Sequence, residues 1–216
     1  MRRRASFATL SATTVLTTMA IAIQLMKMLT RRKLFRSAAI AISGSPLITQ
    51  AARSAKPAKM PPQVGDVLAF PSWEHDGRLV NASEIVAGAK PITVYPHDRN
   101  LGVTRERYRL NQILLLKLAA DEIDDETANI SRDGVLAYSG VCTHTACAVS
   151  EWDADSQHII CPCHSSEFDP GRQAKVVNGP APRSLPSLAI EIRDDLVVIA
   201  GGFSAKVGAK KKSGFS

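Results

Sequence analysis

The first 56 residues contain no acidic residue but 10 lysines and arginines, and residues 206–216 add four lysines. All 20 acidic residues of the chain lie in residues 57–205, which hold 13 basic residues, so this part carries a net charge of −7 within a chain of +7. A nucleic-acid-binding protein needs its basic residues on a folded surface. Because the basicity here is terminal, it argues against a nucleic-acid partner.

Long helical patterns are also missing, because no apolar periodicity after residue 60 predicts a helix of more than two turns, although residues 121–128 could form a short one. There is no internal repeat, and aromatic residues make up only 5% of the chain. The apolar runs are short, rich in Val and Ile, and separated by turn residues, which predicts an all-β fold. The predicted strands are Val67–Phe70, Ile92–Tyr95, Ile113–Leu118, Val135–Tyr138, His158–Ile160, Leu188–Ile192 and Leu196–Ile199, the last two forming a hairpin. The acidic run within residues 121–126 lacks the glycine spacing of a calcium loop, so a solvated face is expected.

Residues 1–52 have the features of a targeting segment. The sequence TRRKLFR at residues 30–36 precedes a weakly apolar run of about 13 residues, which together resemble a twin-arginine export signal. An accidental arginine pair before an alanine-rich loop is the alternative. Because a membrane span needs roughly 20 residues, cleavage of this run is favoured over its retention as an anchor.

The true start of the chain is open. Residues 7–26 contain no charged residue and are just long enough for a membrane helix, whereas a start at Met26 or Met28 would make the first 25 residues an over-called start. Residues 53–63, rich in Pro, Lys and Ala, predict a linker. The folded domain is expected at residues 64–205, followed by a basic tail at 206–216.

The four cysteines fall into two short boxes, which also hold two of the five histidines. The first box reads Cys142-Thr-His144-Thr-Ala-Cys147, and the second reads Cys161-Pro-Cys163-His164-Ser-Ser166. A zinc site is disfavoured, because tetrahedral zinc sites typically use cysteines spaced C-x-x-C, whereas the boxes have C-x4-C and C-x-C. Two plain structural disulfides would leave the paired histidines unexplained. The other three histidines, His75, His97 and His158, are assigned no role.

The spacing C-x-H with C-x-x-H resembles the signature of the Rieske iron-sulfur family. The resemblance implies a 2Fe-2S cluster, with one iron bound by Cys142 and Cys161 and the other by His144 and His164. Two neutral imidazoles in place of two thiolates remove negative charge from the cluster, which makes its reduction easier. The reduction potential of such clusters is about −150 to +300 mV, compared with about −400 mV for plant-type clusters with four thiolates.

The two remaining cysteines indicate the branch of the family. In the high-potential branch, which includes the iron-sulfur subunits of cytochrome bc complexes, positions matching Cys147 and Cys163 form a disulfide. The ferredoxins of aromatic-ring oxygenases usually lack this pair. A disulfide also agrees with an exported location.

The resemblance further assigns residues that tune the cluster. Residues 178–182, which include Gly179 and Pro180, resemble the proline loop that covers the cluster and limits its contact with solvent. Ser166 matches a serine that donates a hydrogen bond to a bridging sulfide and so raises the potential. Phe168 stands where quinol-oxidising subunits have a tyrosine, so a potential below the respiratory average is predicted.

Other positions depart from the quinol-oxidising pattern, whose boxes usually read CTHLGC and CPCHGS. This chain has Thr145, Ala146 and Ser165 at three of these positions. The residues before the first box (135–139) and at the end of the second (166–169) look more like the small Rieske subunits of arsenite oxidase-type molybdenum oxidases.

The resemblance predicts a Rieske fold of antiparallel sheets with an inserted cluster-binding subdomain at residues 138–183. The expected function is electron transfer, without bond chemistry of its own, in a membrane-associated respiratory complex at the periplasmic side of the bacterial inner membrane. The electron donor would be a quinol, beside a cytochrome b, or a molybdopterin subunit, and the acceptor a c-type cytochrome or a cupredoxin. The alternative is a ferredoxin-type component of an oxygenase system, because the chain is too short to hold a mononuclear iron domain as well.

Overall fold

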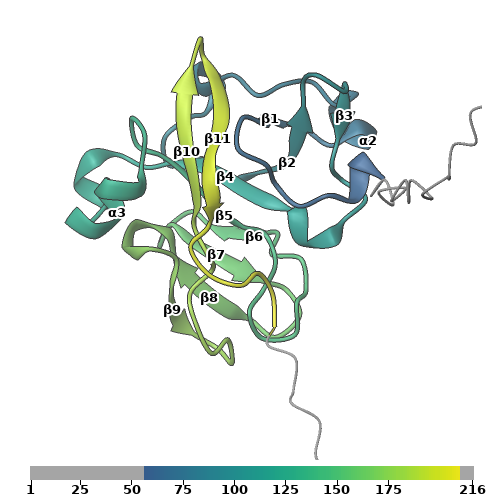
Figure 1. Ribbon diagram of the computed structural model, residues 1–216. Helices are drawn as coiled ribbons and strands as arrows, with labels where there is room; N and C mark the ends of the chain where they lie inside the picture. The colour runs from purple at the N-terminus through teal and green to yellow at the C-terminus, as the bar shows by residue number, and fades with distance from the viewer. Residues whose placement is uncertain (1–55, 210–216) are drawn as a thin grey trace, which may run out of the picture. The chain divides into compact units, whose positions relative to one another are not determined.

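The computed structural model describes residues 56–209, which form two antiparallel sheets with short helices (Figure 1). The predicted signal or anchor at residues 1–52 and the end of the basic tail lie outside the described residues. The strands are β1 (Val67–Ala69), β2 (Ile92–Asp98), β3 (Val103–Thr104), β4 (Ile113–Lys117), β5 (Val135–Ser139), β6 (Glu151–Asp153), β7 (His158–Cys161), β8 (Ser166–Asp169), β9 (Lys175–Asn178), β10 (Leu188–Arg193) and β11 (Leu196–Phe203). The helices are α2 (Ser72–His75) and α3 (Asp125–Ile130), with 3-10 turns η1 (Pro57–Lys59), η2 (Ala82–Glu84), η3 (Arg109–Asn111), η4 (Ala120–Glu122) and η5 (Pro170–Arg172).

The larger sheet has the strand order β10-β11-β1-β2-β4-β5, with β3 paired to β2. The smaller sheet has the order β6-β7-β8-β9 and is inserted in the chain between β5 and β10. All strand pairs are antiparallel, so the predicted all-β architecture is confirmed. Within residues 56–209, no helix is long and apolar enough to cross a membrane.

Strands β4 and β5 are buried on both faces, which explains their nearly continuous apolar sequences. Along β4, Ile113 and Leu115 point into the core of the larger sheet, whereas Leu114 and Leu116 belong to a second core. This second core also contains Ile159 and other apolar residues of the smaller sheet. The two sheets therefore share a hydrophobic contact through β4 and β5, which fixes the smaller sheet against the larger one.

The sequence did not predict β3, β6, β8 or β9, because each has only two to four residues, at least one of them polar. The predicted helix at residues 121–128 is corrected: η4 ends at Glu122, and α3 begins only at Asp125. The side chain of Asp124 accepts a hydrogen bond from the backbone N–H of Thr127 (2.8 Å), so this residue caps α3 and interrupts the run. Asp125 and Glu126 are exposed, as expected of a solvated acidic face.

The residues just before Val64, where the sequence predicts a linker, are packed on the fold. The carbonyl oxygen of Pro57 accepts a hydrogen bond from Arg105 (3.0 Å), and that of Met60 accepts one from Asn111 (2.7 Å). Arg105 and Asn111 are themselves buried. Residues 57–60 are therefore attached to the larger sheet, through contacts that no local sequence pattern encodes.

Candidate metal centre

Two loops at one end of the smaller sheet carry both cysteine and histidine boxes. The first loop, residues 140–150, joins β5 to β6, and the second, residues 162–165, joins β7 to β8. Each is closed by a backbone hydrogen bond, from Ala146 N–H to Cys142 O (3.0 Å) and from Ser165 N–H to Cys161 O (2.9 Å). Cys142 and Cys161 thus occupy equivalent places at the starts of two tight turns.

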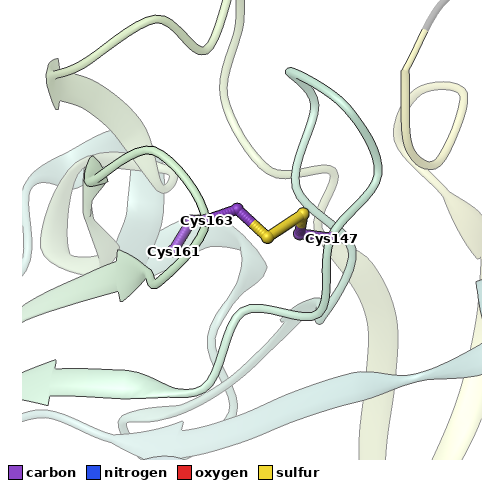
Figure 2. Close-up of side chains that lie close together, drawn as sticks. All are labelled: Cys147, Cys161 and Cys163. Atoms are coloured by element: carbon purple, nitrogen blue, oxygen red, sulfur yellow. A yellow bond between two sulfur atoms is a disulfide. The ribbon is translucent and has the colours of Figure 1, made fainter.

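A disulfide between Cys147 and Cys163 joins the two loops (Figure 2). Its Cα atoms are 6.5 Å apart, and the two residues are 16 positions apart in the sequence. The predicted disulfide is therefore confirmed. It holds the two boxes side by side, although they belong to different strand connections.

The other two cysteines, Cys142 and Cys161, are free and buried. Burial raises the pKa of the Cys161 thiol, and the neighbouring Cys142 thiol, within hydrogen-bond reach, acts in the same direction. The backbone N–H groups of Cys163 and His164 point at the Cys161 sulfur and oppose this shift. Two adjacent thiols with backbone donors around them suit a bound cation, which would favour their thiolate forms.

The two box histidines lie in contact with one another. The ring centroids of His144 and His164 are 4.7 Å apart, and the ring planes meet at 82°. His164 is exposed, whereas the Nδ1 atom of His144 is buried without a hydrogen-bond partner among the described residues. A buried ring nitrogen without a partner is costly, so this atom is a candidate metal ligand.

The sulfur atoms of Cys147, Cys161 and Cys163 lie within 4.8 Å of one another. Two of these sulfurs are joined in the disulfide, so only the Cys161 thiol of this group is free to bind a metal. The disulfide therefore supports the loops, and free donors come from the remaining cysteines and the two histidines.

A third segment, residues 178–182, lies against the second loop. Gly179 has a φ of +85°, and a Cβ atom at this position would be 2.6 Å from the carbonyl oxygen of Ser165. Only glycine therefore fits here. The backbone N–H of Ala181 donates to the buried hydroxyl of Ser166 (3.1 Å), and Pro180 is exposed. Phe168, in β8, is fully buried in the second core.

Sequence reasoning missed three residues that hold these loops together. The hydroxyl of Thr143 donates to the carbonyl oxygen of Arg183 (2.6 Å), and the guanidinium of Arg183 donates to Gly208 O (2.5 Å). Arg109, from η3, donates to the carbonyl oxygen of Ala146. Thr143 stands inside the first box and could have been singled out there, but the two arginines carry no local signal.

Comparison with known proteins identifies the family. The Rieske [2Fe-2S] domain family matches residues 78–189. The cytochrome bc1 complex Rieske iron-sulfur subunit of Streptomyces lividans is 31% identical over 161 residues, which are 68% of this chain and 93% of that protein. The chain belongs to the Rieske [2Fe-2S] family.

A second relative of this Rieske protein is a putative respiratory nitrate reductase subunit Rieske of Haloferax mediterranei, 36% identical over 135 residues. The match spans 62% of this chain but 57% of that protein. Among solved structures, the soluble domain of Rieske protein II from Sulfolobus acidocaldarius is similar with a TM-score of 0.34 and 22% identity, over 44% of this chain and 66% of that one.

The family establishes the cofactor, since a Rieske domain binds a 2Fe-2S cluster and transfers electrons. The three histidines outside the boxes have structural contacts. His158 pairs with Glu167 (2.6 Å), His97 lies 3.0 Å from the Thr104 hydroxyl, and His75 packs edge-on against Phe70. None of these contacts involves a residue of the two boxes.

Proposed function

We propose that this Rieske protein is the electron-transfer subunit of an exported, membrane-associated respiratory oxidoreductase complex. It accepts one electron at a time from a quinol or a molybdopterin subunit and passes it to a c-type cytochrome or a cupredoxin. The relatives named above, subunits of a cytochrome bc1 complex and of a putative nitrate reductase, support a respiratory assignment. The disulfide supports export, because structural disulfides persist in oxidising compartments.

The proposed ligands are Cys142 and Cys161 for one iron and His144 and His164 for the other. One observation carries this assignment: two buried free thiols and two touching imidazole rings meet at loops joined by a disulfide. The partnerless Nδ1 of His144 fits a metal-bound imidazole. When bound, the cluster supplies one-electron oxidation and reduction at a potential above that of all-thiolate clusters.

The surrounding residues would insulate and tune the cluster. Because the Ser166 hydroxyl accepts its bond from Ala181 N–H, its own proton is free to be donated toward the cluster. Gly179 lies against the second loop, and the segment that contains Gly179 and Pro180 would cover the cluster. Phe168 has no hydroxyl to donate, which supports a potential below that of subunits with a tyrosine here. The exposed ring of His164 is the proposed point of electron exit.

The ligand assignment is tested by iron and sulfide analysis of anaerobically purified protein, followed by pulsed EPR of the reduced state. We expect iron and acid-labile sulfide in equal amounts and hyperfine coupling to two imidazole nitrogens. Replacing His144 or His164 by alanine should remove one coupling or abolish the cluster, whereas His97→Gln, a control far from the boxes in sequence, should leave the spectrum unchanged. Absent sulfide, or a His164→Ala spectrum identical to wild type, would contradict the assignment.

The respiratory assignment is tested by purifying the full chain from membranes of the native organism under mild detergent. A co-purifying cytochrome b or molybdopterin protein supports it and also identifies the electron donor. A co-purifying oxygenase subunit would contradict it and favour the ferredoxin role. Sequencing the N-terminus of the mature protein shows whether residues 1–52 are removed.

A further inference from the structure

A group of basic residues and an acidic groove lie at opposite ends of the smaller sheet, and Glu151 and Glu167, which both pair with Ile160, lie in the strands between them. Because β6, β7, β8 and β9 are antiparallel neighbours, their connections alternate between the two ends of the sheet. The turn at residues 162–165 lies at the end that carries the boxes. The turns at residues 154–157 and 170–174 lie at the other end.

The end with the boxes contains no acidic residue in any of its three segments, residues 140–150, 162–165 and 178–187. It carries three basic residues instead. Arg109 is exposed and bonded to Ala146 O in the first loop, and Arg183 follows the proline loop. Lys206, exposed on the C-terminal segment, lies two residues before Gly208, whose carbonyl accepts from Arg183.

Gly208 shows that these three positions are close together. A Cβ atom placed on it would lie 3.4 Å from the side chain of Ala146 and 3.5 Å from that of Leu110, the neighbour of Arg109. Figure 1 shows the C-terminal segment, in yellow, returning along the smaller sheet to this end. The acid nearest to Arg109 in sequence, Glu106, is engaged elsewhere, since its carboxylate accepts two hydrogen bonds from Ser72. Of the two acids in the strands that follow the loops, Glu167 is paired with His158 (2.6 Å), and Glu151 is exposed at the start of β6.

The opposite end is acidic. Asp121 and Glu122 from η4, Asp155 from the β6–β7 turn and Asp169 from β8 line one groove of about 260 Å³. The single arginine of this groove, Arg172, is paired with Asp169 (2.6 Å). The charge of the described residues is therefore unevenly distributed: Arg109, Arg183 and Lys206 lie at the end that holds the cysteine and histidine loops, and the acidic groove lies at the other end.

We propose that Arg109, Arg183 and Lys206 form a basic docking surface around the exposed His164, and that it selects a redox protein whose cofactor edge is rimmed by carboxylates. This inference rests on the proposed electron-transfer function and adds the chemistry of the partner. A positive end on a domain of negative charge orients an acidic partner toward the cluster during diffusional encounter. Electron transfer then proceeds through the face of the protein that lies nearest to the cluster.

The test uses two inorganic oxidants of opposite charge, ferricyanide and tris(phenanthroline)cobalt(III), mixed with the reduced full-length protein in a stopped-flow instrument. Oxidation by ferricyanide should slow as ionic strength rises from about 10 to about 500 mM, and oxidation by the cobalt complex should accelerate. Three single variants remove one charge each: Arg109→Gln, Arg183→Gln and Lys206→Gln. At low salt, each should slow oxidation by ferricyanide about fivefold and speed oxidation by the cobalt complex by a similar factor. This factor is the effect expected of one charge about 10 Å from a trivalent ion. Arg132→Gln, an exposed arginine after α3, is the charge-matched control and should change either rate by less than about twofold.

Opposite effects on the two oxidants separate charge from structural damage, which would slow both reactions alike. Equal slowing of both oxidants, or equal effects of Arg132→Gln and Arg109→Gln, overturns the proposal. Sedimentation with vesicles of phosphatidylcholine and phosphatidylglycerol tests whether the basic surface binds an anionic membrane instead of a protein. Vesicle binding that is lost in the Arg109→Gln and Arg183→Gln double variant would reassign the basic surface to the membrane. If the purified protein contained no iron and sulfide, the proposed function would be overturned as well. If the cluster were intact but the oxidation rates did not change with ionic strength, only this inference would be overturned.

Discussion

The hydroxyl of Thr143 donates a 2.6 Å hydrogen bond to the carbonyl oxygen of Arg183, 40 residues later in the chain. Thr143 lies between Cys142 and His144, so this bond ties the first loop to the segment after the proline loop. Like the disulfide, it makes the geometry of the proposed ligands depend on more than one loop.

Replacing Thr143 by valine keeps the shape of the side chain but removes this bond and leaves the Arg183 carbonyl without it. We expect a loss of about 1–3 kcal/mol in the free energy of unfolding, because Thr143 is buried. Urea unfolding measures the loss. Thr145→Val, the same change at an exposed position of the same loop, is the control and should cost less than about 0.5 kcal/mol. Equal costs for both variants would contradict the importance of the inter-loop bond.

Ala146 has a φ of +62°, in the left-handed region that favours glycine. Ala146→Gly should therefore stabilise the protein by about 1 kcal/mol, since it removes the steric cost of the Cβ atom. Ala148→Gly is the matched control in the same loop. Ala148 has a negative φ and bridges to Val141 in extended pairing, so its replacement should destabilise the protein by about 0.5–1 kcal/mol. Thermal unfolding of the two variants should shift in opposite directions, and shifts of the same sign would refute the argument.

Gly179 approaches the second loop so closely that no side chain fits. Gly179→Ala should displace the loop at Ser165 and Ser166, costing more than about 1 kcal/mol and reducing the retained iron. Gly202→Ala, where a Cβ atom meets nothing within 4 Å, is the control. Iron content and visible circular dichroism report on the cluster site separately from unfolding. Full iron occupancy and an unaltered spectrum in Gly179→Ala would show that the close contact is unimportant.

Arg105 is buried and pairs with Asp66 through two hydrogen bonds (2.7 and 3.1 Å) and with Asp98 through a third (2.9 Å). Arg105→Ala should lower stability by about 3–5 kcal/mol, because it leaves the buried Asp66 carboxylate without its partner. Limited proteolysis should then cleave sooner within residues 57–60, which lose the bond to Pro57. The exposed neighbour Arg107 provides the control, and Arg107→Ala should change stability by about 0.5 kcal/mol or less. A loss below about 1 kcal/mol in Arg105→Ala would contradict the prediction.

Burial lowers the pKa of His97 below its usual value, a shift that nearby Arg105 and Arg99 increase and that Asp98 and Asp66 oppose. A lowered pKa means that the unfolded chain binds a proton that the folded protein does not, so stability falls as the pH drops through the usual range near 6.5 toward the lower folded pKa. His97→Gln should flatten this fall between about pH 7 and pH 5. Above pH 8, where the imidazole is neutral in both states, the stability curves of the two proteins should run parallel. An identical fall below pH 7 in both proteins would exclude the His97 contribution.

Much of the fold was readable from the sequence. Short Val- and Ile-rich runs separated by turns identified the main strands of the larger sheet, and the hairpin of β10 and β11 is where alternation at Leu188, Ile190 and Ile192 predicts it. The short polar strands of the smaller sheet were missed. Their pairing depends on the apolar contact with β4 and β5, which has no local signature.

The sequence by itself determined the cofactor, because the two cysteine and histidine boxes resemble the Rieske signature, and the same resemblance implied the disulfide between Cys147 and Cys163 that the structure contains. Tertiary structure alone decided which side chains hold the two loops in place and which basic residues lie beside them. Arg109, Thr143 and Arg183 act through contacts between segments 37 to 40 residues apart, and such contacts exist only after hydrophobic packing has fixed the sheets. Local spacing predicts the proposed ligands, whereas long-range packing decides which arginines contact the loops that carry them.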